Sequence, residues 1–199
     1  MDKKDKIQKQ RTLVLIKPDG VARGLMGEII KRFEKVGLKI VGLKMLVPDK
    51  KLAEKHYPVT EEWFKKVGSN TINACPKYGF QAKEVIGTDD PIEIGKKVHQ
   101  WNIDFLTSGP VLAMVLEGIH ALEVARKIAG ETVPLLAAPG TIRGDLTSIS
   151  AISVNLKNNT LYNLVHTSGN DDEAKKEIAL WFSEKEILKY RRTEEDYIF

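Results

Sequence analysis

His166 is the side chain of this sequence with the clearest potential for chemistry. It follows a short stretch of strand character, residues 163–165, and precedes a polar turn, residues 167–170, and then a segment with acids in its first turn and apolar residues at helical spacing. A histidine between a strand and a helix is held by backbone on both sides, while its ring can still face a cleft. A histidine that merely ends a strand explains this segment, taken alone, equally well.

Other polar residues lie at the ends of predicted elements, where loops from different parts of a sheet converge. They are Lys17, Tyr57, Arg126, Thr132, Arg143 and Asn163. Arginine binds phosphate oxygens in a bidentate way, lysine supplies a compact charge, and asparagine and threonine add directional hydrogen bonds. Each residue singly is more often a solvated surface residue. Their joint placement indicates a polyphosphate ligand.

The glycine-rich phosphate motifs are missing from the sequence. It contains no G-x-x-x-x-G-K-[ST] loop, no G-x-G-x-x-G fingerprint and no protein-kinase signature. A nucleotide would therefore be bound by side chains. Imidazole, with an ordinary pKa of about 6.5, is largely neutral near pH 7, so His166 is the candidate nucleophile for phosphorus.

Composition narrows the class of protein. The 199 residues suit one domain, and 31 Lys and Arg against 27 Asp and Glu give a mild basic excess that suits an anionic ligand. The lone Cys75 excludes an internal disulfide framework, and the four histidines show no zinc-binding spacing with it. The charged start has no apolar signal region, and the longest purely apolar run, residues 111–116, is too short to span a bilayer. We expect a cytoplasmic protein without membrane partners.

Hydrophobic patterns predict the elements that position these residues. Strands are predicted at residues 12–16, 38–47, 111–116 and 162–166, and helices at residues 21–36, 52–57, 60–68, 91–105 and 121–129 and after the turn at 167–170. The order βαββαβ predicts an α+β fold, a ferredoxin-like sandwich of an antiparallel four-stranded sheet with helices packed on it.

We expect residues 1–199 to form a single domain with a helical insertion at about 58–108 and a short C-terminal extension from about 183. Within the insertion, an apolar stripe indicates core or subunit packing. It consists of Ile94, Val98, Trp101 and Phe105. Ser183 and Glu186 form a predicted capping box at the start of a short final helix.

Three segments closely resemble nucleoside diphosphate kinases. They are R-T-L-V-L-I-K-P-D-G at residues 11–20, A-P-G-T-I-R-G-D at residues 138–145, and residues 163–182, which begin with N-L-V-H. The combination of N-x-x-H with G-T-I-R-G-D is highly specific, and the resemblance runs from Arg11 to about Phe182 apart from two insertions. It implies transfer of the terminal phosphate of ATP to nucleoside diphosphates, by a ping-pong reaction through a phosphohistidine on His166.

The resemblance also implies roles for the phosphate ligands. Lys17 would hold the transferring phosphate and contact the sugar 3′-hydroxyl, with Tyr57 close to that phosphate and to His166. Arg126, Thr132 and Arg143 match residues that grip the β- and γ-phosphates, and Asn163 matches the residue that hydrogen-bonds the ribose. Mg²⁺ would arrive with the nucleotide and bridge phosphates, with no protein side chain as a ligand.

Ser168 and Glu177 match the pair that supports the nucleophile in this family, the glutamate by positioning the imidazole. Without the resemblance, Glu177 would be interpreted as a polar-face residue of an amphipathic helix. The sequence departs from the family at Gly169, where an aspartate commonly follows the serine. The expected effect is a looser turn with all phosphate ligands retained.

The long insertion leaves the base contacts open. Phe64 is the candidate for stacking on the base, Trp63 is the alternative, and core packing is an equal possibility for either. Residues 148–161 also form a longer link than is usual. The family assembles as hexamers, less often as tetramers or dimers, and the loop at residues 132–138 resembles the one used in subunit contacts. We expect a homo-oligomer, with a hexamer as the leading expectation.

Two other functions compete with this interpretation. RNA-recognition domains share the βαββαβ order, but the aromatic-glycine segment at residues 77–80 has the wrong spacing and lies in the insertion. A nucleotide-binding family member without catalysis is the second alternative. The presence of Lys17, Arg143, Asn163 and His166 argues against it.

Overall fold

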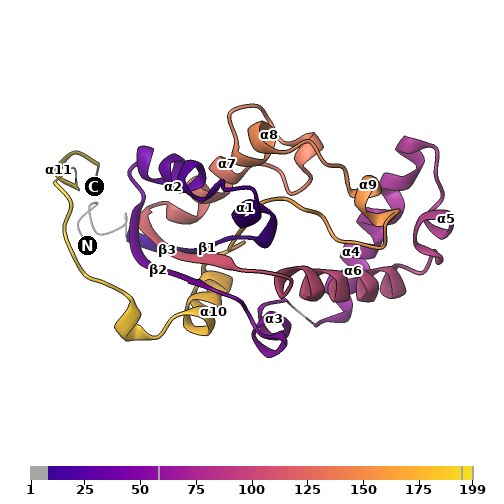
Figure 1. The fold of residues 1–199 in the computed structure, drawn as a ribbon, viewed down its shortest axis with the longest axis horizontal. Coiled ribbons are helices and arrows are strands. Elements are labelled where there is room, and N and C mark those ends of the chain that lie inside the picture. Colours follow the sequence, from indigo (N-terminus) through magenta and orange to yellow (C-terminus); the bar gives the residue numbers. More distant parts are fainter. Residues whose placement is uncertain (1–8, 58, 194, 199) are drawn as a thin grey trace, which may run out of the picture.

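The computed structural model describes residues 9–57, 59–193 and 195–198. Residues 1–8 of the charged start, and Pro58, the first residue of the expected insertion, lie outside these ranges. The described residues form a four-stranded antiparallel sheet in the order β2-β3-β1-β4 (Figure 1). The strands are β1 (Lys9–Ile16), β2 (Lys39–Leu46), β3 (Val111–Ile119) and β4 (Val165–Thr167). The predicted ferredoxin-like α+β sandwich is confirmed.

Helices cover both faces of the sheet, because alternate residues of β1 point to opposite faces. Val14 and Ile16 pack with α2 (Met26–Lys35) and α7 (Ala121–Ala129), while Leu13 and Leu15 pack on the face covered by α3 (Lys50–His56) and α10 (Asp171–Trp181). β1 is buried on both faces from Leu13 to Ile16, which accounts for its continuous apolar run. The central strand therefore fixes the position of whatever follows Ile16.

The helix predicted at residues 21–36 is wrong as a single element. The chain instead forms α1 (Pro18–Ala22) and α2, separated by a turn in which Gly24 has φ +68°. A left-handed residue interrupts helical hydrogen bonding, and glycine adopts that conformation at low cost. The short α1 thus starts directly after Lys17, with Pro18 in its first turn.

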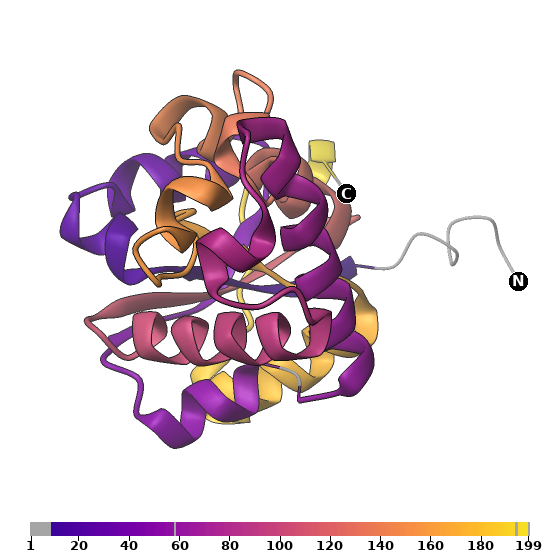
Figure 2. The ribbon, with the colours of Figure 1, turned by 90° about the vertical axis from the view of Figure 1, so that its right-hand side faces the viewer.

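The insertion forms a helical extension at one end of the sheet (Figure 1), and this end faces the viewer in Figure 2. Its elements are α4 (Glu61–Ala74), a 3₁₀ turn η2 (Cys75–Tyr78), α5 (Ala82–Ile86) and α6 (Pro91–Leu106). Together with α9 (Ala151–Asn155) they enclose a small separate core. Ile94, Val98 and Trp101 of the predicted stripe pack into this core, whereas the Phe105 ring lies 4.8 Å from that of Tyr162.

The sequence predicted that the first helix of the insertion ends at Gly68. This prediction is wrong, since α4 continues to Ala74. A Cβ on Gly68 would lie 1.8 Å from the Pro91 carbonyl oxygen, and one on Gly95 would lie 2.2 Å from that of Phe64. The two glycines therefore permit a close crossing of α4 and α6.

The C-terminal segment runs along the edge strand β2. After α10 come a 3₁₀ turn, η4 (Glu184–Glu186), which has the predicted capping box of Ser183 and Glu186, and α11 (Glu195–Ile198). The Leu188 amide donates to the Val41 carbonyl at 2.7 Å, so this segment lies along β2. Within the described residues, no helix has the length and apolar character needed to cross a membrane.

Candidate active site

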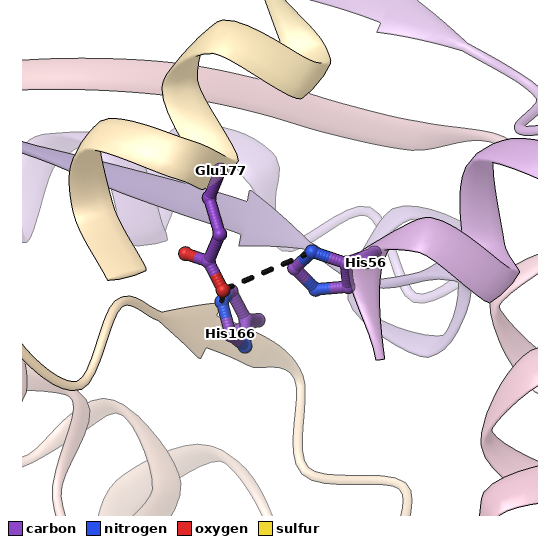
Figure 3. A group of neighbouring side chains, drawn as sticks. All are labelled: His56, His166 and Glu177. Carbon is purple, nitrogen blue, oxygen red and sulfur yellow. Dashed lines mark hydrogen bonds and ion pairs between the residues drawn. The ribbon is translucent and has the colours of Figure 1, made fainter. Parts of the chain in front are cut away.

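His166 lies on β4, and its ring is held from α10 by Glu177 (Figure 3). The His166 Nε2 and Glu177 Oε1 atoms are 2.9 Å apart, with the histidine side chain 23% exposed. Because a carboxylate only accepts hydrogen bonds, this contact places the imidazole proton on Nε2. Nδ1 is then the nitrogen with a free lone pair.

Ser168 fixes the other oxygen of Glu177. Its hydroxyl donates to Glu177 Oε2 at 2.5 Å and accepts from the Leu13 amide at 3.2 Å. The Ser168 amide in turn donates to the Leu13 carbonyl at 3.2 Å, and the residue is fully buried. The carboxylate beside His166 is therefore oriented by the central strand of the sheet.

His56, which sequence reasoning missed, packs against the nucleophile candidate. It ends α3, its side chain is fully buried, and its ring lies 4.4 Å from that of His166 in an edge-on arrangement. Its Nδ1 accepts a hydrogen bond from Trp181 Nε1 at 3.3 Å. Burial, together with the nearby His166 and Lys17, holds the pKa of His56 well below its ordinary value. His56 is therefore neutral at pH 7.

Lys17 and Asn163 meet at the ends of β1 and β4. Lys17 Nζ donates to Asn163 Oδ1 at 2.8 Å, and the Asn163 amide nitrogen donates to the Thr132 carbonyl at 2.9 Å. Burial, and secondarily the charge of Arg143, lowers the pKa of Lys17 to about 8, with Asp19 opposing the shift. Among the described residues no carboxylate forms an ion pair with this buried lysine, a situation that an anionic ligand would relieve.

Arg143 is buried behind the same region. Its guanidinium donates to the carbonyls of Asn163 at 3.1 Å, Gly130 at 2.6 Å and Val165 at 2.7 Å. Burial is the main cause that lowers its pKa to about 10, so it remains charged at pH 7. Arg143 belongs to α8 (Ile142–Leu146), a short helix that begins within the A-P-G-T-I-R-G-D segment at residues 138–145.

Leu164 explains why β4 starts later than the predicted strand at residues 162–166. Its φ is +66°, a left-handed conformation that is unusual for a branched residue and breaks the strand. The Lys17 amide donates to its carbonyl at 2.8 Å, and its own amide donates to Asp19 Oδ2 at 3.0 Å. These bonds from both sides hold Asn163 against Lys17 while His166 continues in the sheet.

The remaining candidate phosphate ligands lie around this group. Arg126 is exposed on α7, and its Nη1 donates to the Gly169 carbonyl at 3.0 Å, next to Ser168. The Gly169 amide donates to Glu173 Oε2 at 2.9 Å, so the turn that lacks the usual aspartate has partners on both of its backbone groups. Thr132 is exposed and joins the group through its carbonyl, which binds Asn163.

Each of the aromatic candidates, Tyr57, Phe64 and Trp63, packs against a histidine ring. Tyr57 packs 5.0 Å from the His56 ring, and its hydroxyl is buried without a partner among the described residues. Burial, and then the charge of Glu177, raise the pKa of Tyr57. Phe64 is 9% exposed and packs on His99 at 5.6 Å and on Trp63 at 5.8 Å. The structure thus brings Tyr57 near His56 and places Phe64 within the aromatic packing of the insertion.

Comparisons with known proteins all match one family. A sequence profile described as "Nucleoside diphosphate kinase" matches residues 10–76 and 92–187. A nucleoside diphosphate kinase of Pyrobaculum aerophilum is 45% identical over 179 residues, covering 90% of this chain and 98% of the relative. One of Borreliella burgdorferi is 40% identical over 188 residues, covering 94% of this chain and 95% of the relative.

Solved structures agree with the sequence matches. A crystal structure of an NDP kinase from Pyrobaculum aerophilum superposes with a TM-score of 0.87 at 43% identity, covering 92% of this chain and all of that one. A transition-state mimic of the Borreliella burgdorferi enzyme, with bound vanadate and ADP, superposes with a TM-score of 0.75 at 38% identity and covers 94% of this chain and 95% of that one.

Proposed function

Because the chain belongs to the nucleoside diphosphate kinase family, we propose that the phosphate it transfers is carried on Nδ1 of His166. The protein is a nucleoside diphosphate kinase, a phosphotransferase that acts on nucleotides. The observation that carries the proposal is the 2.9 Å contact of His166 Nε2 with Glu177, since it leaves Nδ1 as the nucleophilic atom.

In the first half-reaction, the Nδ1 lone pair forms a bond to the γ-phosphorus of ATP. The bond from that phosphorus to the bridging oxygen breaks, and ADP leaves with the electron pair. The imidazole becomes positively charged as the bond forms, and the Glu177 carboxylate on Nε2–H stabilises that charge. The second half-reaction reverses these steps with another nucleoside diphosphate as the acceptor.

The proposed nucleotide ligands are Lys17, Arg126, Thr132, Arg143 and Asn163. Support comes from the direct hydrogen bonds among Lys17, Asn163 and Arg143, and from the contact of Arg126 with the turn after His166. Arg143 uses one N–H on each of its three nitrogens for carbonyls, which leaves two of its five donors for a phosphate. Asn163, aligned by Lys17 and Thr132, is the proposed ribose contact.

Mg²⁺ is the proposed cofactor, bound through the nucleotide. The proposed nucleotide ligands that hydrogen-bond one another, Lys17, Asn163 and Arg143, are cationic or a neutral amide, which fit phosphate oxygens rather than Mg²⁺. The metal would neutralise phosphate charge while these residues orient the chain of phosphates.

The assembly and compartment belong to the same proposal. A homo-oligomer, with a hexamer expected, is supported by apolar side chains exposed in the loop at residues 132–138, Leu135 at 49% and Leu136 at 64%. A single domain with an insertion is supported by the profile match, which passes over residues 77–91. A reducing cytoplasm is supported by Cys75, a free buried thiol.

Labelling with γ-labelled ATP and Mg²⁺ tests the proposed function. We expect acid-labile, alkali-stable label on the protein, and its transfer to GDP as GTP. His166→Ala should abolish both. Label that persists at the wild-type level on His166→Ala would contradict the proposed carrier, and an absence of label on the wild type would favour nucleotide binding without catalysis.

A further inference from the structure

His166 also belongs to a second group of side chains, apart from the proposed phosphate ligands. His56, His166 and Glu177 each offer one ligand atom, and these atoms lie within 4.8 Å of one another (Figure 3). The residues come from α3, β4 and α10, so their sequence spacing gives no sign of a shared site. Two imidazoles and a carboxylate are a ligand set typical of zinc and similar divalent ions.

The distances suit such an ion. Zinc with bonds of about 2.0–2.1 Å places tetrahedral ligand atoms about 3.4 Å apart. Glu177 Oε1 lies 2.9 Å from His166 Nε2 and 3.8 Å from His56 Nδ1, values on either side of that separation. All three ligand atoms lie within 4.8 Å of one another, so side-chain rotation would have to shorten the longer separations when the ion binds. The His166 side chain is 23% exposed, and the fourth ligand would be water.

The lone pairs required for coordination are mostly in place. Trp181 N–H donates to His56 Nδ1, so Nδ1 carries a lone pair, and the 3.3 Å length of that bond makes it a weak competitor. Ser168 already donates to the second Glu177 oxygen, which is the supporting contact that carboxylate ligands usually have. The one group that must change is His166 Nε2, which bears the imidazole proton.

We propose that His56, His166 and Glu177 bind Zn²⁺ or a similar borderline divalent ion, and that this ion inhibits phosphate transfer. A metal on Nε2 displaces its proton, and the neutral imidazole then carries a proton on Nδ1 instead. That proton occupies the lone pair which attacks phosphorus. This effect on activity rests on the proposed function, because it requires Nδ1 of His166 to be the nucleophile.

Magnesium does not compete for this site. Mg²⁺ prefers oxygen ligands in octahedral geometry, whereas two of the three atoms here are imidazole nitrogens. The nucleotide-bound Mg²⁺ and the proposed inhibitory ion are therefore separable by their chemistry. Inhibition should persist in a large excess of Mg²⁺ and be reversed by a chelator that is selective for zinc.

Co²⁺ titration provides a readout independent of activity, since four-coordinate Co²⁺ has strong visible absorption. We expect a single ion per chain, displaced by Zn²⁺ and not by Mg²⁺. His56→Phe, which preserves a ring beside His166, and Glu177→Gln should each weaken Zn²⁺ binding at least tenfold. The control is His120→Asn, which removes a histidine outside the cluster at φ +51°, a conformation that asparagine tolerates; it should bind Zn²⁺ as the wild type does.

Labelling separates failure of this inference from failure of the proposed function. Zn²⁺ should suppress phosphoenzyme formation in the wild type, and the phosphoenzyme should bind Co²⁺ at least tenfold more weakly than the free enzyme. Unaltered labelling in saturating Zn²⁺, or Zn²⁺ affinity unaffected by both His56→Phe and Glu177→Gln, would overturn the inference while leaving the carrier role of His166 intact. Metal binding with this variant pattern, in a protein whose label lies elsewhere, would retain the site and contradict the proposed carrier.

Discussion

Glu177 is held between the imidazole of His166 and the hydroxyl of Ser168, because its carboxylate accepts from Nε2 and from Ser168. In the proposed mechanism it orients the ring and stabilises the charge that develops during transfer. Glu177→Gln keeps the shape but removes the charge, and its amide can donate to Nε2 and favour the wrong tautomer. We expect phosphoenzyme formation from ATP to slow about 100-fold in single-turnover measurements.

The matched control for this variant is Asp172→Asn, which removes an exposed carboxylate from the first turn of the same helix. It should label at the wild-type rate. Equal rates for Glu177→Gln and the wild type would show that the carboxylate charge is not used in the transfer.

The lowered pKa of Lys17 predicts that nucleotide binding weakens at alkaline pH. Its folded-state pKa is lowered to about 8, so Lys17 is mostly charged below this pH, where it would attract the phosphates that it is proposed to bind, and is mostly neutral above it. kcat/KM for ATP, which reports the free enzyme, should therefore fall as pH rises through about 8. Lys17→Arg should move this limb upward, because a guanidinium keeps its proton to about pH 12. A limb in the same place in both proteins would assign it to another group.

The sequence identified candidate site residues that follow or precede predicted strands. It did not identify His56, which lies in a helix and contacts His166 only in the folded protein. Lys17 and Asn163 form a direct hydrogen bond, and Arg143 donates to the Asn163 carbonyl. His56 immediately precedes Tyr57, yet nothing in the sequence indicates that α3 brings its ring against His166. Such contacts depend on how α3 packs against α10, which local patterns do not encode.

Glycines at the crossing of α4 and α6 set the distance between these helices. Gly68→Ala would place a methyl group 1.8 Å from the Pro91 carbonyl, so the helices must separate. Overpacking of this kind costs about 1–3 kcal/mol, which in a chain of this size lowers Tm by roughly 2–12 °C in calorimetry. Gly27→Ala on α2 is the control, because its Cβ would meet no atom within 4 Å; it should keep or raise Tm.

The same glycine shows why element boundaries were harder to predict than elements. A glycine in a helical pattern can end the helix or allow a close approach, and the sequence pattern is the same in both cases. Leu164 presents the opposite difficulty, since an apolar residue before Val165 favours a strand while its φ of +66° is imposed by bonds to Lys17 and Asp19. The order of strands and helices along the chain, in contrast, followed from the hydrophobic patterns, and that order predicted the sandwich.

The C-terminal segment covers one edge of the whole sheet and is held there by charge. Hydrogen bonds from Lys9, from the Arg192 amide and from Lys39 lower the pKa of Glu195 to about 2. Because this pKa is lower in the folded than in the unfolded protein, the stabilisation is complete above about pH 4.5 and is lost as pH falls toward 2. Glu195→Gln should therefore lower the urea midpoint at pH 7 and have little effect near pH 2.

Urea unfolding of both proteins at one protein concentration tests this, because assembly makes stability depend on concentration. Glu184→Gln, which changes an exposed carboxylate on the preceding helical turn, is the control and should match the wild type at both pH values. A difference between Glu195→Gln and the wild type that is constant from pH 7 to pH 2 would rule out the proposed ionic contribution.

The atom that carries the phosphate tests the account of the active site most directly. NMR of the phosphoenzyme, with ¹⁵N-labelled histidine and phosphorus detection, distinguishes phosphate on Nδ1 from phosphate on Nε2. The contact between Nε2 and Glu177 predicts phosphate on Nδ1 of His166, with the Nε2 proton retained. Phosphate on Nε2, or on any other residue, would contradict it.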